Sequence, residues 1–411
     1  MKTFTTLYFI FISSLLFSQS INFETLLQEG KRELYKDSEH QNLNNAIKKL
    51  EQAILIEPKN AEAHYFLGYA YSRFNSFDGR SIISMNSNLT IKSSEQFEIV
   101  NRLTPKYNGE ILVLDPYSKL TGEWGGQAMC YIYKNKLDSA LWAFKEGKKR
   151  GGFGNFFLSI NRKVLDSCSP NAILITSGDN FTIPLWYLQF VEHYRTDVTV
   201  IDISLLNTLW YPKFIKNKNK ISFGKKYKEL DSVIFKPWTD TKISIKTPNK
   251  KVFSWILKPS YSTNYEQYIL RNDVLLLNLL KKNKFNREVY FTTGFYEANK
   301  LSLSNHLKSY IIIEKINYDQ QPQLSFSEYK TMIYSVIDCL KYLNRNSLSE
   351  NNFVDNIRYE LLYRIDSCLQ KGNKNEAKML FEIFDEKLSL NIYPKLSEQG
   401  TKYYKYLKLK I

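Results

Sequence analysis

Two short apolar runs in the middle of the chain are each followed by polar residues. Residues 172–175 precede the polar stretch 176–180, and residues 198–203 precede the stretch 204–208. Between the two runs, residues 184–194 repeat apolar positions at helical spacing. This order predicts a strand, a loop, a helix and a second strand, which together form a βαβ unit. Because parallel sheets bind ligands at the carboxyl ends of their strands, we expect the two polar loops to lie side by side.

The alternation of strand-like and helix-like patterns continues to residue 318. Residues 289–293 predict a third buried strand, residues 273–283 an amphipathic helix and residues 310–313 a further strand. Short alternating runs over 221–262 predict a β-hairpin or edge strands. Because alternating strands and helices favour parallel strands with right-handed crossovers, we predict a Rossmann-like, mostly parallel α/β domain over residues 164–318.

Small and large apolar residues recur at fixed spacing before this domain. Residues 46–71 resemble the second helix of one tetratricopeptide repeat and the first helix of the next, and residues 124–144 resemble both helices of another. One such helix pair cannot bury its own apolar face, so these repeats stack on one another. The positions that carry the pattern are Ala46, Leu50, Ala53, Pro58, Gly68, Tyr71, Trp124, Ala128, Tyr131, Ala140 and Phe144.

Three regions follow a short N-terminal leader in the predicted organisation. Residues 21–160 form a tetratricopeptide-like helical domain, with an irregular insertion near 81–110, where Ser, Asn and Thr are frequent. The α/β domain occupies 164–318, and residues 325–411 return to a helical pattern. The predicted fold class is therefore α/β plus all-α, with tetratricopeptide-like helical pairs flanking the α/β domain.

The N-terminus has the pattern of a secretory signal peptide. Lys2 is followed by an apolar stretch over residues 4–17, and residues 18–20 offer a small-x-small cleavage pattern. The stretch is shorter than the roughly 20 residues that span a bilayer. We expect residues 1–20 to be removed and the mature chain to have no transmembrane segment. The expected location is the periplasm or cell envelope of a Gram-negative bacterium.

The chain is strongly basic, with a formal net charge of +16. The 45 Lys and 12 Arg residues are scattered along helix-like segments, whereas nucleic-acid binders concentrate them on one face. A solvated basic surface is the favoured interpretation, and we expect no nucleic-acid partner. An anionic envelope polymer remains the alternative, and its binding would fall steeply with ionic strength.

Cysteine and histidine usage offers little material for a metal or cofactor site. None of the four cysteines forms a CxxC motif, and the four histidines are widely separated. We expect neither a metal nor a cofactor. An oxidising compartment allows three disulfide pairings, but buried free thiols are the favoured interpretation. The cysteines are Cys130, Cys168, Cys339 and Cys368.

Polar and aromatic residues directly after the three predicted strands form the candidate ligand site. Asp179 has two interpretations: it binds a hydroxyl, amine or cation beside Gly178, which allows close backbone approach, or it belongs to a helix N-terminus. No second carboxylate is placed to face it, so we name no catalytic residue. The candidate binding residues are Gly178, Asp179, Asn180, Asn207, Thr208, Trp210, Thr293 and Gly294.

Aromatic residues near these loops have two expected roles. Trp210 is the candidate for an exposed ring, which could stack on a sugar. Trp186 and Tyr187 lie on the predicted helix and are expected to pack on the sheet instead. Asn207 and Thr208 are expected to approach Asp179 from the neighbouring strand, either bridging the loops or contacting a ligand.

Several strings occur in an order that resembles one family. GDNFTIPLWYLQ, VIDISLLNTLWY and REVYFTTG, with WGGQAMCYIY before them, are similar to the soluble C-terminal region of bacterial membrane proteins related to the protein O-mannosyltransferases. The resemblance covers residues 120–318 and implies a detached extracytoplasmic module, since the membrane-spanning transferase part is absent. Phe181 and Leu209 stand where family members tend to carry acids. If those acids ligate a cation or a polar group, the resemblance implies that this protein has lost that function.

These observations favour an exported, non-catalytic binding or scaffold module. It would hold a protein, peptide or glycan partner in a cell-envelope process, with the helical repeats supplying protein contacts. The alternative is an enzyme or accessory subunit that acts on glycans or glycosylated proteins, centred on Asp179.

Overall fold

A computed structural model describes residues 22–411 except 38, 78, 294–296 and 394–395. The expected signal peptide, residues 1–20, lies outside the described residues. The chain divides into two compact units, one ending at Phe153 and the other beginning at Gly154. Each unit is described by itself below.

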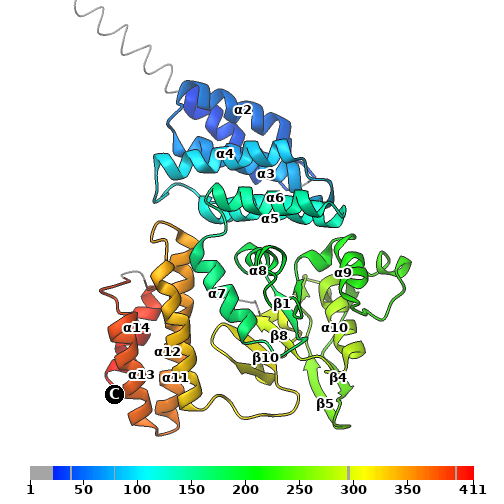
Figure 1. Ribbon diagram of the computed structural model, residues 1–411, viewed down its shortest axis with the longest axis vertical. Coiled ribbons are helices and arrows are strands. Elements are labelled where there is room, and N and C mark those ends of the chain that lie inside the picture. Colours follow the sequence, from blue (N-terminus) through cyan, green and yellow to red (C-terminus); the bar gives the residue numbers. More distant parts are fainter. Residues whose placement is uncertain (1–21, 38, 78, 294–296, 394–395) are drawn as a thin grey trace, which may run out of the picture. The chain divides into compact units, whose positions relative to one another are not determined.

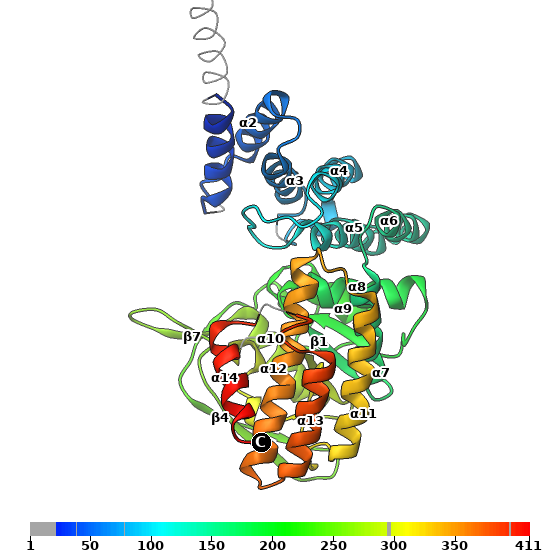
Figure 2. The same ribbon diagram turned by 90° about the vertical axis from the view of Figure 1, so that its left-hand side faces the viewer.

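The first unit is built from antiparallel helices that pack side by side (Figures 1 and 2). A helix over residues 22–35 is followed by α2 (Leu43–Ile56), α3 (Ala61–Ser76), α4 (Ser87–Leu103), α5 (Pro116–Tyr133) and α6 (Leu137–Lys149). Four of these helices are preceded by a capping residue. Its side chain accepts a hydrogen bond from a backbone N–H of the first turn that would otherwise be unpaired. These caps are Asn42, Asn60, Asn86 and Asp115.

The segment near 81–110 corrects one expectation. We expected an irregular insertion, but residues 87–103 form α4, which packs against α3 and α5. Its polar residues are satisfied inside the unit: Ser93 donates to the carbonyl of Gly68, at 2.8 Å, and Ser94 accepts from the indole of Trp124, at 2.9 Å. Polar composition therefore did not exclude a buried helix face here.

The second unit contains a five-stranded sheet in the order β2-β1-β8-β10-β9. The strands β1 (Ile173–Thr176), β2 (Thr199–Asp202) and β8 (Val289–Thr292) are parallel. The strands β9 (Leu307–Ser309) and β10 (Ile313–Ile316) join the sheet in antiparallel pairings. The sheet is therefore mixed: β10 is antiparallel to both of its neighbours, and the three residues between β9 and β10 are too few for the crossover that a parallel pairing requires.

Helices cover both faces of this sheet (Figures 1 and 2). On one side lie α7 (Asn155–Asp166) and α8 (Asp179–Val191), and α10 (Arg271–Asn283) lies on the other. The helix α9 (Tyr211–Asn219) follows β2. All four residues of β1, β2 and β8 are buried, as expected for strands that helices cover on both faces.

Short strands fill the connection between α9 and α10. The predicted hairpin is present as β4 (Thr241–Lys246) and β5 (Val252–Leu257), which pair in antiparallel register. The remaining strands are β3 (Lys236–Pro237), β6 (Tyr261–Ser262) and β7 (Gln267–Ile269).

The unit ends in the helices α11 (Phe326–Ile337), α12 (Leu348–Gln370), α13 (Lys374–Lys387) and α14 (Glu398–Lys408). Phe353 of α12 packs against Phe156 and Phe157 of α7, which joins these helices to the layer over the sheet. Within the described part of the chain, no helix is both long enough and apolar enough to cross a membrane.

Candidate functional site

The turn between β1 and α8 starts the candidate site. Gly178 adopts a φ of 81° and directly precedes α8, whose first residue is the half-buried Asp179. A Cβ at Gly178 would meet no atom within 4 Å, so the glycine is needed for its backbone conformation and not for close approach. Asn180 accepts a hydrogen bond on its carbonyl from Asn161, at 2.9 Å. These observations agree with a helix N-terminus.

A buried hydrogen-bond network joins the ends of β1 and β2. Thr182 of α8 donates to the carboxylate of Asp202, and its hydroxyl lies 2.7 Å from that of Thr176. The other carboxylate oxygen of Asp202 accepts from the backbone of Leu205, at 2.9 Å. Burial raises the pKa of Asp202 to about 6, and nearby Asp179 also raises it. This carboxyl closes the turn after β2 and is sealed from solvent.

The loop after β2 is turned toward α10. The side-chain oxygen of Asn207 accepts from the backbone of Asn272, at 3.1 Å. Thr208 donates to the carbonyl of Leu205, at 2.7 Å. Arg271, at the start of α10, donates to the carbonyl of Leu206, at 3.2 Å. The side chain of Asn207 therefore bridges this loop to α10, while the side chain of Thr208 closes the turn of the loop itself.

Trp210 is buried, so the expectation of an exposed stacking ring is wrong. Its side chain is only 6% exposed and packs edge-on against Tyr211, with ring centres 5.2 Å apart, and against Phe214. The cause is local: Trp210 caps α9, and its ring folds onto the first turn of that helix. Leu209 beside it is the exposed residue. Trp186 and Tyr187 are buried, as predicted.

Thr293 lines a cavity of about 340 Å³ between the sheet and α12. Its backbone N–H donates to the carbonyl of Ile312, at 3.1 Å, which fixes the turn after β8. Gly294, predicted to complete this rim, lies outside the described residues. Asp179 and Asn207 are not among the lining residues, which include Thr293, Ile312, Glu314, Phe353, Asn356 and Glu360.

Two carboxyl groups give this cavity its chemistry. Burial raises the pKa of Glu360 to about 7, nearby Glu314 raises it further, and a hydrogen bond from Ser309 opposes the shift. Glu314 pairs with Lys300, at 2.7 Å. Such a cavity, with apolar walls and few polar groups, can hold a small ligand.

The contribution of α12 was missing from the sequence analysis. Phe353, Asn356, Ile357 and Glu360 recur at the spacing of one helical face, so a 3.6-residue period could have revealed a polar position on a buried face. Phe353 also contacts Phe181, with ring centres 5.7 Å apart. Phe181, which replaces an acid in the resemblance, therefore packs against the helix that lines the cavity.

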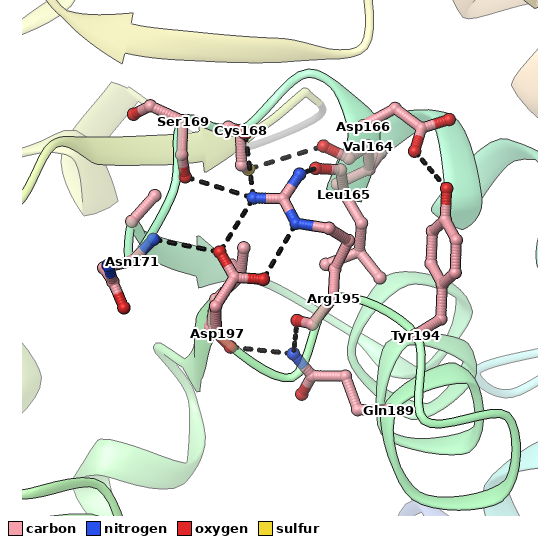
Figure 3. A network of polar contacts seen from close by, with 12 residues as sticks. Val164, Leu165, Asp166, Cys168, Ser169, Asn171, Gln189, Tyr194, Arg195 and Asp197 are labelled. Carbon is pink, nitrogen blue, oxygen red and sulfur yellow. Dashed lines mark hydrogen bonds and ion pairs between the residues drawn. The ribbon is translucent and has the colours of Figure 1, made fainter.

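A separate network braces the opposite, amino-terminal edge of β1 and β2 (Figure 3). The guanidinium of Arg195 donates to the carbonyls of Leu165, Cys168 and Ser169 and to the carboxylate of Asp197. The Arg195 hydrogen bond lowers the pKa of Asp197 to about 2. The donors of Arg195 bind backbone carbonyls and the Asp197 carboxylate of the chain itself, so this network is structural.

The predicted repeat positions of the first unit lie inside its helical packing. Gly68 approaches Phe97 so closely that a Cβ would lie 3.0 Å from its ring, and Tyr131 contacts Trp142. Pro58 lies between α2 and α3, and Tyr71 is buried on α3. Buried positions on α2, α5 and α6 are Ala46, Leu50, Ala53, Trp124, Ala128, Ala140 and Phe144.

Comparison with known families assigns a model to each unit. Residues 158–224 match TMEM260-associated domain 2. Residues 39–73 match a TPR repeat. The first match spans most of α7 through α9, and the second covers α2 and most of α3. TMEM260 is an O-mannosyltransferase-like protein, so the predicted resemblance is supported at this coarser level. Comparison with curated proteins gave no match.

The TMEM260-associated match contains six of the eight candidate binding residues, from Gly178 to Trp210. Most of their polar contacts are internal: Asn180 bonds α7, Asn207 bonds α10, and Trp210 packs on α9. Thr293 lies beyond the matched region, at the cavity. The structure thus distributes the predicted site over a helix start, a loop bridge and a cavity.

Proposed function

We propose that this protein is an exported, non-catalytic scaffold that holds a protein or peptide partner through its first unit, which ends at Phe153 and is here named the TPR unit. Its setting would be a cell-envelope process linked to the glycosylation of proteins. The α/β unit would contribute a pocket for a small polar ligand, such as a glycan unit, beside Thr293.

The observation that carries the proposal is the TPR match together with the stacked helices of the first unit. TPR helices present side chains from successive pairs on one continuous surface, which suits an extended partner segment. Tyr35 is 53% exposed on the helix over 22–35, and aromatic residues are favoured at protein interfaces.

The choice of a non-catalytic role rests on the carboxyl groups near Asp179. Asp202 lies beside it but is buried and accepts hydrogen bonds from Thr182 and Leu205. A pair of carboxylates that work on a glycan must both reach the substrate. The match to a TMEM260-associated domain supports the glycosylation-related context and names no reaction for this chain.

Site-specific photo-crosslinking in cells tests the proposal. A photo-reactive residue is placed at Tyr35 and, as a matched control in the other unit, at Leu409, which is 89% exposed. We expect a defined adduct with a partner protein from position 35 and none from position 409. Adducts only from position 409 would contradict the proposal. Turnover of a glycopeptide by the purified chain, lost in Asp179→Asn, would instead support the enzyme.

A further inference from the structure

The connection between α4 and α5 folds back over the start of the TPR unit. Residues 104–115 form neither helix nor strand, and they lie against the helix over 22–35 and α3 (Figure 2). These two helices are the first members of successive pairs. Their shared surface, defined by Lys31, Tyr35, Glu62 and Tyr65, is here named the first-helix face.

An acidic residue of this connection is bound by the first-helix face. The ammonium of Lys31 lies 2.5 Å from the carboxylate of Glu110 and 2.5 Å from that of Glu62. The hydroxyl of Tyr35 also donates to Glu110. Lys31 is buried, which disfavours its charge, but the two carboxylates outweigh this and raise its pKa. Glu110 is therefore one of the two carboxylates that pair with the buried ammonium of Lys31.

An aromatic ring and the main chain of the same segment are bound beside it. Tyr107 stacks on Tyr65, with ring centres 5.1 Å apart and planes 19° apart. The Tyr65 hydroxyl donates to the carbonyl of Leu114, at 2.9 Å, and accepts from the backbone of Leu112, at 3.1 Å. These contacts join backbone, aromatic ring and carboxylate of one extended segment.

This combination is how a protein surface recognises an extended peptide: main-chain hydrogen bonds hold the segment, while side-chain partners select its sequence. We infer that residues 104–115 are a resident occupant of the first-helix face, and that an acidic partner segment binds there by displacing them. The contacts define the partner's chemistry, an aromatic residue followed three positions later by a carboxylate, as in Tyr107 and Glu110. The inference rests on the proposed function and adds the partner class.

A tethered occupant lowers the affinity measured for any competitor. Only the fraction of molecules whose face is open can bind, so the apparent Kd rises by the inverse of that fraction. Because both ends of the segment are attached to the unit, its effective concentration is high, on the order of millimolar for a short tether. Weakening its attachment should therefore tighten binding of the same sequence supplied as a separate peptide.

Fluorescence anisotropy with a labelled peptide of residues 104–115, TPKYNGEILVLD, tests this with the full chain. Glu110→Lys places a positive charge beside Lys31 and opens the face. Glu95→Lys is the matched control, because Glu95 is an exposed residue of α4 and the charge change is the same. Lys31→Met, added to Glu110→Lys, keeps an unbranched apolar side chain but removes the ammonium. Circular dichroism monitors the folding of each variant.

We expect Glu110→Lys to bind the peptide at least about tenfold tighter than the unmodified chain does. Glu95→Lys should bind like the unmodified chain, and Lys31→Met should reverse the gain. A peptide with Gln in place of its glutamate should bind more weakly.

Equal affinity for the unmodified chain and a folded Glu110→Lys chain would overturn the inference, as would a gain that survives Lys31→Met. If Glu110→Lys does not fold, hydrogen exchange on the unmodified chain decides. Exchange of residues 104–115 as slow as that of α3 would show a permanent part of the core and overturn the inference. Exchange of residues 104–115 that is faster than that of α3, and faster still with excess peptide, would support release. Tyr35 is 53% exposed with residues 104–115 in place, so a partner adduct from position 35 together with an unchanged peptide affinity would support the proposed function and overturn this inference alone.

Discussion

Asp202 illustrates how a carboxylate at the end of a strand serves the fold. Its two oxygens accept from Thr182 and from the backbone of Leu205, and its own N–H donates to the hydroxyl of Tyr211, at 3.0 Å. The sequence showed an acid beside a polar loop, where ligands often bind. Asp202 is buried, and its three hydrogen bonds link the end of β2 to α8, to the following turn and to α9.

Asp202→Ala should lower the free energy of unfolding of the chain by about 2–4 kcal/mol, because it leaves the buried hydroxyl of Thr182 and the partly buried N–H of Leu205 without their acceptor. Asp202→Asn keeps an oxygen for Leu205 and should cost less than half as much. Chemical denaturation at pH 8 measures both variants. Equal stability of the two would show that the hydrogen bonds do not stabilise the turn.

The raised pKa values of Asp202 and Glu360 predict how stability depends on pH. Their folded values are about 6 and about 7, against ordinary values of 3.8 and 4.5. At pH values between the ordinary and the folded pKa of each carboxyl, the folded state keeps a proton that the unfolded chain has released. The free energy of unfolding therefore falls as pH rises through this range. Each group should contribute on the order of 1–3 kcal/mol to this loss.

Denaturation curves from pH 4 to pH 8 check this slope. Asp202→Asn should remove the part of the slope that ends near pH 6, and Glu360→Gln the part that ends near pH 7. A double variant with an unchanged slope would refute the assignment to these two carboxyls.

At the scale of elements, glycines set how closely the repeat helices pack. A Cβ at Gly147 of α6 would lie 2.4 Å from the Cβ of Trp124 in α5, and 2.8 Å from the ring of Phe153. Such contacts are far inside van der Waals distance, so the helices would have to separate.

Gly147→Ala should therefore lower the free energy of unfolding by about 2 kcal/mol or more, despite the better helix propensity of alanine. Lys145→Ala, at an exposed position two residues earlier, is the control and should change stability by less than about 0.5 kcal/mol. Thermal unfolding followed by circular dichroism compares them. A stabilised Gly147→Ala chain would mean that α5 and α6 are packed less closely.

The repeat helices could be predicted because their signal is local, whereas α4 could not. Small residues such as Ala46 and Ala140 occupy buried positions that a fixed spacing reveals. In α4 the buried face carries Thr90, Ser93 and Ser94, whose partners lie on α3 and α5. Hydrophobic periodicity cannot identify a face that is stabilised by hydrogen bonds to other helices.

The candidate site was predicted less well than the strands that precede it. The βαβ unit was correctly predicted by its apolar runs, and Gly178 does stand at the start of α8. The bridge from Asn207 to α10 depends on a segment 65 residues away in sequence, whereas Trp210 is buried by rings of the helix that directly follows it. The cavity at Thr293 also needs α12, about 60 residues later. No local pattern shows that this helix lies beside Thr293.

At the scale of the whole molecule, the four cysteines are free and buried. Burial raises the pKa of Cys168 to about 12, which keeps its thiol protonated and unreactive. A chain exported to an oxidising compartment would therefore depend on packing and not on disulfides for its stability.

Thiol titration of the unreduced chain tests this prediction. The folded protein should react slowly, and the denatured protein should yield four thiols per chain. Adding a reductant should leave the midpoint of thermal unfolding unchanged. A yield of two thiols, with a lower midpoint after reduction, would reveal a disulfide.

Under the proposed function, the TPR unit binds a partner protein and the α/β unit supplies a small pocket. Hydrogen–deuterium exchange of the full chain, with and without the partner captured by crosslinking, tests that division most directly. We predict new protection in residues 22–35 and in α3, with little change at the carboxyl ends of β1 and β2. Protection centred on Asp179 and Thr293, with residues 22–76 unchanged, would contradict the account.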